Sequence, residues 1–257
     1  MIFFKKIHLK HTAFAFSYNE AEDKTTFKKI EDYMKITFLK EYSFDEFLSK
    51  KSEFNLTTDI LIVSYGVLGK VSSISEVKGE TDVILKLSAL SRELNCVILG
   101  GIDFDLYGEM RKSVVICDCG KLCGISDTIY QKGDYLSSNI INIYETSLGK
   151  IGIIVDSDVY HTEIAHALKL YGADFLVCIV DSEMNENIYN HIMCAAYDRG
   201  LTIVCASNDC GISGKQKCEL VYNAKEPFCT QDITISTDVG IECKSAVYKT
   251  IYKKLLE

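Results

Sequence analysis

The feature that most constrains the fold is a strand–helix–strand pattern in residues 149–180. Residues 151–155 form a short, apolar, largely β-branched run, which is typical of a strand covered on both faces. In residues 164–171 the apolar positions recur at i, i+3, i+4 and i+7, which predicts an amphipathic helix that Gly172 can end in a left-handed conformation. Residues 175–180 form a second apolar strand. Such units build parallel sheets, so the chain is predicted to be of the α/β class.

The same alternation of strands and helices extends on both sides of this unit. Further strands are expected within 58–66, at 96–99, 114–117 and 201–206, and at 218–222 and 232–235 as closing strands of a second sheet. Helices are expected at 83–94, around 188–200 and around 247–255. Toward the N-terminus the pattern suggests strands at 11–17 and 36–41 and helices at 24–35 and 44–54, and the organisation of residues 1–57 stays open. We treat residues 1–257 as one domain.

The composition excludes several classes of function. The net charge of -8 disfavours a partner that is nucleic acid or an anionic membrane surface. No basic region precedes an apolar core of signal-peptide length, so we expect a cytoplasmic protein in which the 11 cysteines are reduced thiols. The spacing Cys117-x-Cys119-x3-Cys123 has no second pair at zinc-finger spacing, so we interpret these as packed or strand-alternating thiols and expect no metal or cofactor.

The central unit also carries a family resemblance. Gly-Lys-Ile-Gly at 149–152, an apolar strand, a strand-end aspartate, a glutamate and Gly-Ala-Asp at 172–174 follow in an order that resembles the carbon–nitrogen hydrolase (nitrilase and amidase) superfamily. In that family the strand ends in a nucleophilic cysteine. Asp158 matches the aspartate that follows the cysteine and Glu163 matches the family's glutamate, whereas Asp156 occupies the position of the cysteine. The resemblance implies a four-layer α-β-β-α sandwich and a homodimer.

The resemblance also locates the two other catalytic positions of the family. The strand within 58–66 resembles the one that ends in Phe-Pro-Glu, and Tyr65 stands where the family has its general-base glutamate. Thr128 stands where the family has its lysine. Lys132 lies four residues further on and would reach the site only if the loop between them took another register. Asn208 belongs to a stretch that resembles the family's Asn-x-x-Gly.

These substitutions predict that hydrolysis is lost. Cleavage of an amide or nitrile by this family needs a thiolate nucleophile, a carboxylate that takes its proton, and a cation for the developing oxyanion. Asp156, Tyr65 and Thr128 fill none of these roles. Loss of one member of such a unit costs on the order of 10⁴ to 10⁶ in rate. The sequence therefore predicts a catalytically silent homologue that acts, if at all, by binding a small molecule or a partner protein.

Three interpretations of the site remain open at this point. The first is a pocket for a small polar ligand, with an amine-bearing molecule as one option, and the second is an amidase or nitrilase with a rearranged site. The third is a Mg²⁺-dependent phosphohydrolase, because Asp156-x-Asp158-x-Val resembles the strand end of haloacid-dehalogenase-like phosphatases. Around the triad positions, the predicted pocket residues are Ser157, Asp158, His161, Glu163 and Asn208. For His161 a solvated or internally satisfied side chain is favoured over a catalytic base.

Overall fold

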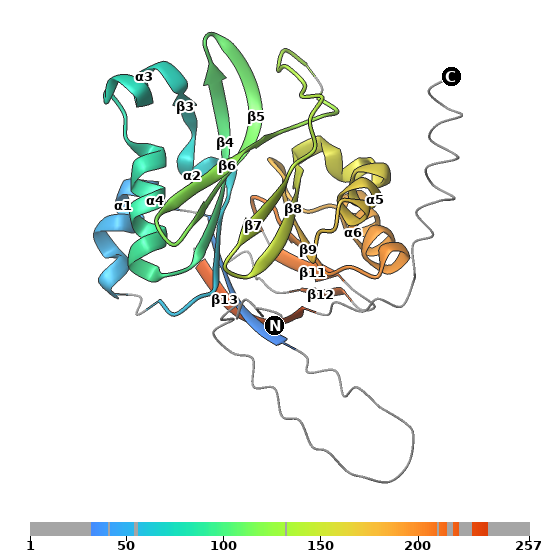
Figure 1. The fold of residues 1–257 in the computed structure, drawn as a ribbon. Helices are drawn as coiled ribbons and strands as arrows, with labels where there is room; N and C mark the ends of the chain where they lie inside the picture. The colour runs from blue at the N-terminus through green and yellow to red at the C-terminus, as the bar shows by residue number, and fades with distance from the viewer. Residues whose placement is uncertain are drawn as a thin grey trace, which may run out of the picture.

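Two β-sheets lie face to face, and helices cover the outer side of each (Figure 1). The structure is a computed structural model that describes residues 32–40, 42–53, 56–131, 133–209, 211–214, 218–220 and 228–235. This arrangement is the four-layer α-β-β-α sandwich that the sequence predicts. In the described part of the chain, no helix is long and apolar enough to span a membrane.

The first sheet has seven strands in the order β13-β1-β2-β4-β5-β6, with β3 paired to β4. Its strands are β1 (Asp32–Leu39), β2 (Ile60–Val63), β3 (Lys70–Ser72), β4 (Val97–Leu106), β5 (Glu109–Asp118), β6 (Lys121–Asp127) and β13 (Phe228–Ile235). Strands β1, β2 and β4 are parallel, whereas β4, β5 and β6 form antiparallel hairpins.

The second sheet has six strands in the order β12-β11-β10-β9-β8-β7. Its strands are β7 (Ile143–Thr146), β8 (Gly149–Val155), β9 (Phe175–Ile179), β10 (Ile203–Ala206), β11 (Gly211–Gly214) and β12 (Cys218–Leu220). The central strands β8, β9 and β10 are parallel and fully apolar on both faces over most of their length, as expected for strands buried between two layers.

The helices pack on the outer faces through apolar stripes. They are α1 (Phe44–Lys50), α2 (Tyr65–Leu68), α3 (Ser73–Lys78), α4 (Val83–Leu94), α5 (Thr162–Leu170) and α6 (Glu186–Arg199), with short 3₁₀ helices η1 (Lys51–Glu53) and η2 (Asp156–Tyr160). Helices α1 and α4 cover the first sheet, and α5 and α6 cover the second (Figure 1). A third apolar cluster joins the inner faces of the two sheets, so the core has three layers of side chains.

The central unit folds as its periodicity predicts. Strand β8, helix α5 and strand β9 coincide with the predicted elements, although β8 and α5 each begin two residues earlier than predicted, and Gly172 follows α5 with a φ of +94°. Gly152 explains how closely the helix approaches the sheet. A Cβ at this position would lie 2.6 Å from Leu176 Cδ2 and 3.1 Å from Leu168 Cβ, so only glycine lets α5 pack against β8 and β9.

Two predictions near the chain ends are wrong. Residues 32–35 belong to strand β1 rather than to the end of a helix, because their backbone pairs antiparallel with β13 in the first sheet. The strand at 232–235 is part of β13 and pairs with β1, so it closes the first sheet and not the second. The strand predicted at 11–17, most of the helix at 24–35 and the helix at 247–255 lie outside the described residues.

Candidate functional site

Polar side chains gather where the parallel strands of both sheets end. Tyr65 follows β2, Asp156 follows β8, Asp181 follows β9 and Asn208 follows β10. The carboxyl ends of parallel strands leave a crevice in which the chain turns away from the sheet, and α/β proteins commonly bind ligands there. The two sheets therefore bring together side chains that are far apart in the sequence.

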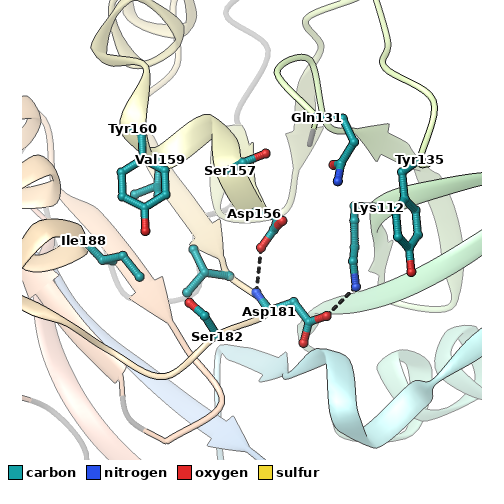
Figure 2. Close-up of a pocket in the computed structure, with 11 residues that line it drawn as sticks. Lys112, Gln131, Tyr135, Asp156, Ser157, Val159, Tyr160, Asp181, Ser182 and Ile188 are labelled. Carbon is teal, nitrogen blue, oxygen red and sulfur yellow. Dashed lines mark hydrogen bonds and ion pairs between the residues drawn. The ribbon is translucent and has the colours of Figure 1, made fainter. Parts of the chain in front are cut away.

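Asp156 sits on a sharp turn between β8 and η2. Its φ is +46°, a left-handed conformation that is unusual for a residue with a Cβ. The turn directs the carboxylate away from the strand, and its Oδ1 accepts a hydrogen bond of 2.9 Å from the backbone N–H of Asp181 (Figure 2). The Asp156 carboxylate therefore lies in the crevice and is hydrogen-bonded to the loop that follows β9.

Tyr65 and Thr128, the other two positions that the resemblance assigns to the triad, are both buried. Tyr65 is 4% exposed, and its hydroxyl has no hydrogen-bond partner among the described residues. Burial raises the pKa of Tyr65 well above its usual value, and the nearby carboxylates of Asp156 and Asp181 raise it further. The phenol is therefore neutral. The Thr128 hydroxyl donates a hydrogen bond of 3.4 Å from Oγ1 to the carbonyl oxygen of Val155 and so links the end of β6 to the end of β8.

A lysine that sequence reasoning missed lies beside Thr128. Lys112 is on β5, and its carbonyl accepts the backbone N–H of Thr128 at 2.9 Å. Its ammonium pairs with Asp103 Oδ1 at 2.7 Å and with Asp181 Oδ2, so it joins the two sheets. Burial opposes the charged form, yet hydrogen bonds to Asp103 and Asp181 outweigh this and raise the pKa of Lys112 above its usual value.

Aromatic rings complete the surroundings of this ammonium. Lys112 Nζ lies 4.8 Å from the ring centroid of Tyr65 and 5.1 Å from that of Tyr135. These distances are within the range of cation–π attraction. Lys112 is only 8% exposed, and its charge is balanced by two carboxylates and two aromatic faces.

The crevice contains a cavity of about 360 Å³, near the lower limit for small-ligand sites (Figure 2). Its lining is formed by Lys112, Gln131, Tyr135, Asp156, Ser157, Val159, Tyr160, Val180, Asp181, Ser182 and Ile188. Asp156 lies near its centre, with Lys112, Gln131 and Tyr135 on one side and Val159, Tyr160 and Ile188 on the other. The cavity is therefore polar on one side and apolar on the other.

Solved structures of similar fold identify the architecture. An amidase of the nitrilase superfamily from Nesterenkonia superposes with a TM-score of 0.65 at 11% identity, covering 84% of this chain and 96% of that one. A carbon–nitrogen hydrolase from Helicobacter pylori superposes with a TM-score of 0.62 at 14% identity, covering 79% and 89%. The chain has the nitrilase fold. No protein-family model matches the sequence, and a search of curated proteins finds no match.

Within the nitrilase fold, Ser157 and Asp158 hold the turn in shape. Ser157 Oγ donates to the carbonyl of Tyr130 and lines the cavity. Asp158 is 3% exposed, and its carboxylate accepts the backbone N–H groups of Ile129 at 3.0 Å and Tyr130 at 2.8 Å. Burial raises its pKa to about 6 although these hydrogen bonds oppose the shift.

The engagement of Asp158 argues against the phosphohydrolase interpretation. A Mg²⁺ ion bridging Asp156 and Asp158 would need both carboxylates directed at one point. Asp158 instead points into the protein, toward the loop after β6. Among the residues that the structure describes, no group of three or more His, Cys, Asp or Glu side chains is arranged to hold a metal ion.

The three other predicted pocket residues lie around the cavity rather than in its lining. The ring of His161 stacks on Tyr130 at 3.7 Å between centroids, and its Nδ1 is 3.5 Å from Glu163 Oε1. Glu163 is half-exposed in the first turn of α5, where the helix dipole favours a carboxylate. Asn208 donates from Nδ2 to Asp181 Oδ1 at 3.1 Å and so supports a residue that does line the cavity.

Lys112 was missed for a reason that lies in the hairpin of β4 and β5. The sequence predicts a strand only at 114–117, whereas β5 begins at Glu109, and its pairing with β4 places Asp103 opposite Lys112 and extends to Leu106 opposite Glu109. The turn at Tyr107-Gly108, together with opposite charges at 103 and 112, is the signal that would have revealed this cross-strand pair. Lys132, the lysine that the sequence suggested, lies outside the described residues.

Proposed function

We propose that this chain is a homologue within the nitrilase superfamily that binds a small molecule and does not hydrolyse it. The observation that carries the proposal is the residue on the turn after β8. This is Asp156, held at positive φ in the crevice, where the resemblance predicts the cysteine nucleophile. Among the described residues, none of those that line the cavity is a cysteine.

The thiols nearest in the sequence do not replace the nucleophile. Cys178 lies in β9, is fully buried in the layer between the second sheet and its helices, and has its pKa raised well above the usual value by burial. A buried thiol with a raised pKa is an inert core residue rather than a reactive thiolate. Tyr65, neutral and buried, cannot accept a proton as a carboxylate base would.

Lys112 favours a second candidate function, the hydrolysis of a small amide by a rearranged site. Its ammonium is a cation in the crevice, and Asp103 and Asp181 are carboxylates beside it. These groups come from other places in the chain than the lysine and glutamate positions that the resemblance assigns. A nucleophile is still needed, and attack by the Asp156 carboxylate on an amide would give an acid anhydride from a weak nucleophile. We therefore rank this function second.

One assay separates the two. The purified chain is incubated with a panel of small amides and nitriles, and released ammonia is measured. Binding is followed in parallel by thermal shift with the same panel and with small amines and carboxylates. The proposal expects ligand-dependent stabilisation without ammonia release. Ammonia release that is lost in both Asp156→Ala and Lys112→Gln would overturn it in favour of the rearranged hydrolase.

A covalent probe gives an independent check. In mutants of the Nesterenkonia amidase, the acetamide moiety of fluoroacetamide is covalently added at the active-site cysteine. Peptide mapping of this chain after the same treatment should find no adduct in residues 149–160. An adduct on Asp156 would identify it as a working nucleophile and contradict the proposal. Cys119 and Cys194, which are exposed, serve as internal controls for nonspecific labelling.

A further inference from the structure

The charge of the cavity indicates what kind of ligand it takes. The lining contains two carboxylates, Asp156 and Asp181, and Lys112 is its one basic side chain among the described residues. Lys112 is already paired with Asp181 and with Asp103 on the neighbouring strand. The Lys112 charge is therefore satisfied within the protein, and no basic side chain of the described residues pairs with Asp156.

The carboxylate of Asp156 also has unused hydrogen-bonding capacity. Its Oδ1 accepts the backbone N–H of Asp181, and within the described residues its other oxygen has no donor. The side chain lies near the centre of the cavity (Figure 2). A carboxylate facing a small cavity with a free oxygen favours a ligand that carries N–H donors and positive charge.

Tyr65 lies next to the charged side of the cavity. It is 4% exposed, and its hydroxyl lacks a partner among the described residues. The centroid of its ring is 4.8 Å from Nζ of Lys112, which lines the cavity. Buried polar groups rarely stay unpaired, so this hydroxyl is a second polar group, beside Asp156, whose hydrogen-bonding capacity is not used by the described residues.

The wall of the cavity opposite Lys112 indicates what the uncharged part of the ligand is. Val159, Tyr160 and Ile188 form an apolar side, with the ring of Tyr160 37% exposed. The volume of about 360 Å³ admits only a small molecule. A short alkyl or aryl group against this wall would place a polar end at Asp156.

From these observations we infer that the ligand is a small organic ammonium ion, bound with its charged end at Asp156 and a short apolar body against Val159, Tyr160 and Ile188. The inference rests on the proposed binding function and specifies its ligand class. The ammonium donates to the free oxygen of Asp156, while Lys112 stays paired with Asp103 and Asp181. Anionic ligands of the same size are disfavoured by Asp156.

The test is titration calorimetry of the full chain with three probes of equal length: butylammonium, butyramide and butyrate. Butylammonium is expected to bind at least 10-fold more tightly than either of the others. Asp156→Asn keeps the size of the side chain and removes its charge, and it should weaken butylammonium binding by about 10- to 100-fold while changing butyramide binding little. Glu183→Gln removes an exposed carboxylate outside the cavity lining and is the matched control for net charge.

A second variant keeps the test informative if Asp156→Asn fails to fold. Tyr160→Ala removes part of the apolar wall at a partly exposed position, so it should weaken butylammonium more than methylammonium. Equal affinity for all three probes, no binding of butylammonium, or unchanged binding by Asp156→Asn would each overturn the ligand class. If butyramide or butyrate binds instead, the ligand class is wrong and the binding function stands. Hydrolysis of butyramide would instead overturn the binding function itself.

Discussion

At the scale of single residues, Asp156 combines an unfavourable backbone conformation with a favourable hydrogen bond. Its φ of +46° costs a residue with a Cβ about 1 kcal/mol, whereas glycine adopts this conformation freely. Asp156→Ala keeps the strain and loses the bond to the Asp181 N–H, so we expect a loss of about 1–2 kcal/mol in unfolding free energy. Asp156→Gly should be about 1 kcal/mol more stable than Asp156→Ala. Urea denaturation measures both, and equal stabilities would contradict the strained turn.

Asp158 should make stability depend on pH. Its folded-state pKa is raised to about 6 by burial, against about 3.9 in an unfolded chain. Between these values the folded protein holds a proton that the unfolded chain releases, so the Asp158 contribution falls as pH rises from about 4 to about 6 and is constant above. The difference between the folded and unfolded pKa values corresponds to a change of roughly 3 kcal/mol in the free energy of unfolding.

The measurement has to separate the effect of Asp158 on the pH dependence of stability from the effect of His166. Burial lowers the pKa of His166, so its contribution falls as pH drops below about 6.5 and opposes that of Asp158. We therefore expect the difference in unfolding free energy between the wild type and Asp158→Asn to decrease by about 2–3 kcal/mol from pH 4 to pH 6.5. A difference that does not change with pH in this window would show that folding does not raise the pKa of Asp158.

At the scale of elements, the contact of α5 with β8 and β9 depends on Gly152. A Cβ there would meet Leu176 Cδ2 at 2.6 Å, so Gly152→Ala should destabilise the fold by about 1–3 kcal/mol through overpacking. The matched control is Gly66→Ala in α2, where nothing lies within 4 Å, and helix propensity predicts a gain of up to about 1 kcal/mol. Thermal unfolding of both variants tests the prediction, and similar shifts in Tm would refute the packing argument.

The elements that the sequence predicts correctly are those whose pattern is local. The apolar runs of β8 and β9 and the helical period of α5 depend on residues close in the chain. Strand β13 pairs with β1 across almost the whole sequence, so no local pattern shows which sheet it joins. Lys112 reaches the site through the pairing of β5 with β4 and β6, and only that long-range register shows that a lysine stands beside Thr128.

At the scale of the whole molecule, three exposed tyrosines lie on the outer side of the second sheet. Tyr171, Tyr189 and Tyr197, on and beside α5 and α6, are exposed, with Tyr197 at 68%. The resemblance implies a homodimer formed through helices near the nucleophile position and through the C-terminal segment, and aromatic side chains are enriched in protein interfaces. We therefore expect the chain to be a dimer that pairs α5 and α6 of two copies.

Tyr197→Glu tests this expectation because it puts a charge at the centre of the predicted contact. Sedimentation velocity should show the wild type as a dimer and the variant shifted toward monomer, with about a 10-fold or greater rise in the dimer dissociation constant. Leu85→Glu is the matched control, since Leu85 is 71% exposed on α4, which covers the other sheet. If the wild type is monomeric, or if Leu85→Glu dissociates the dimer while Tyr197→Glu does not, the pairing through α5 and α6 is wrong.

Dimer formation at this surface would also affect the cavity. Because η2 contacts α6 and carries Asp156, a partner packed on α6 would help to hold the turn that places the Asp156 carboxylate in the cavity.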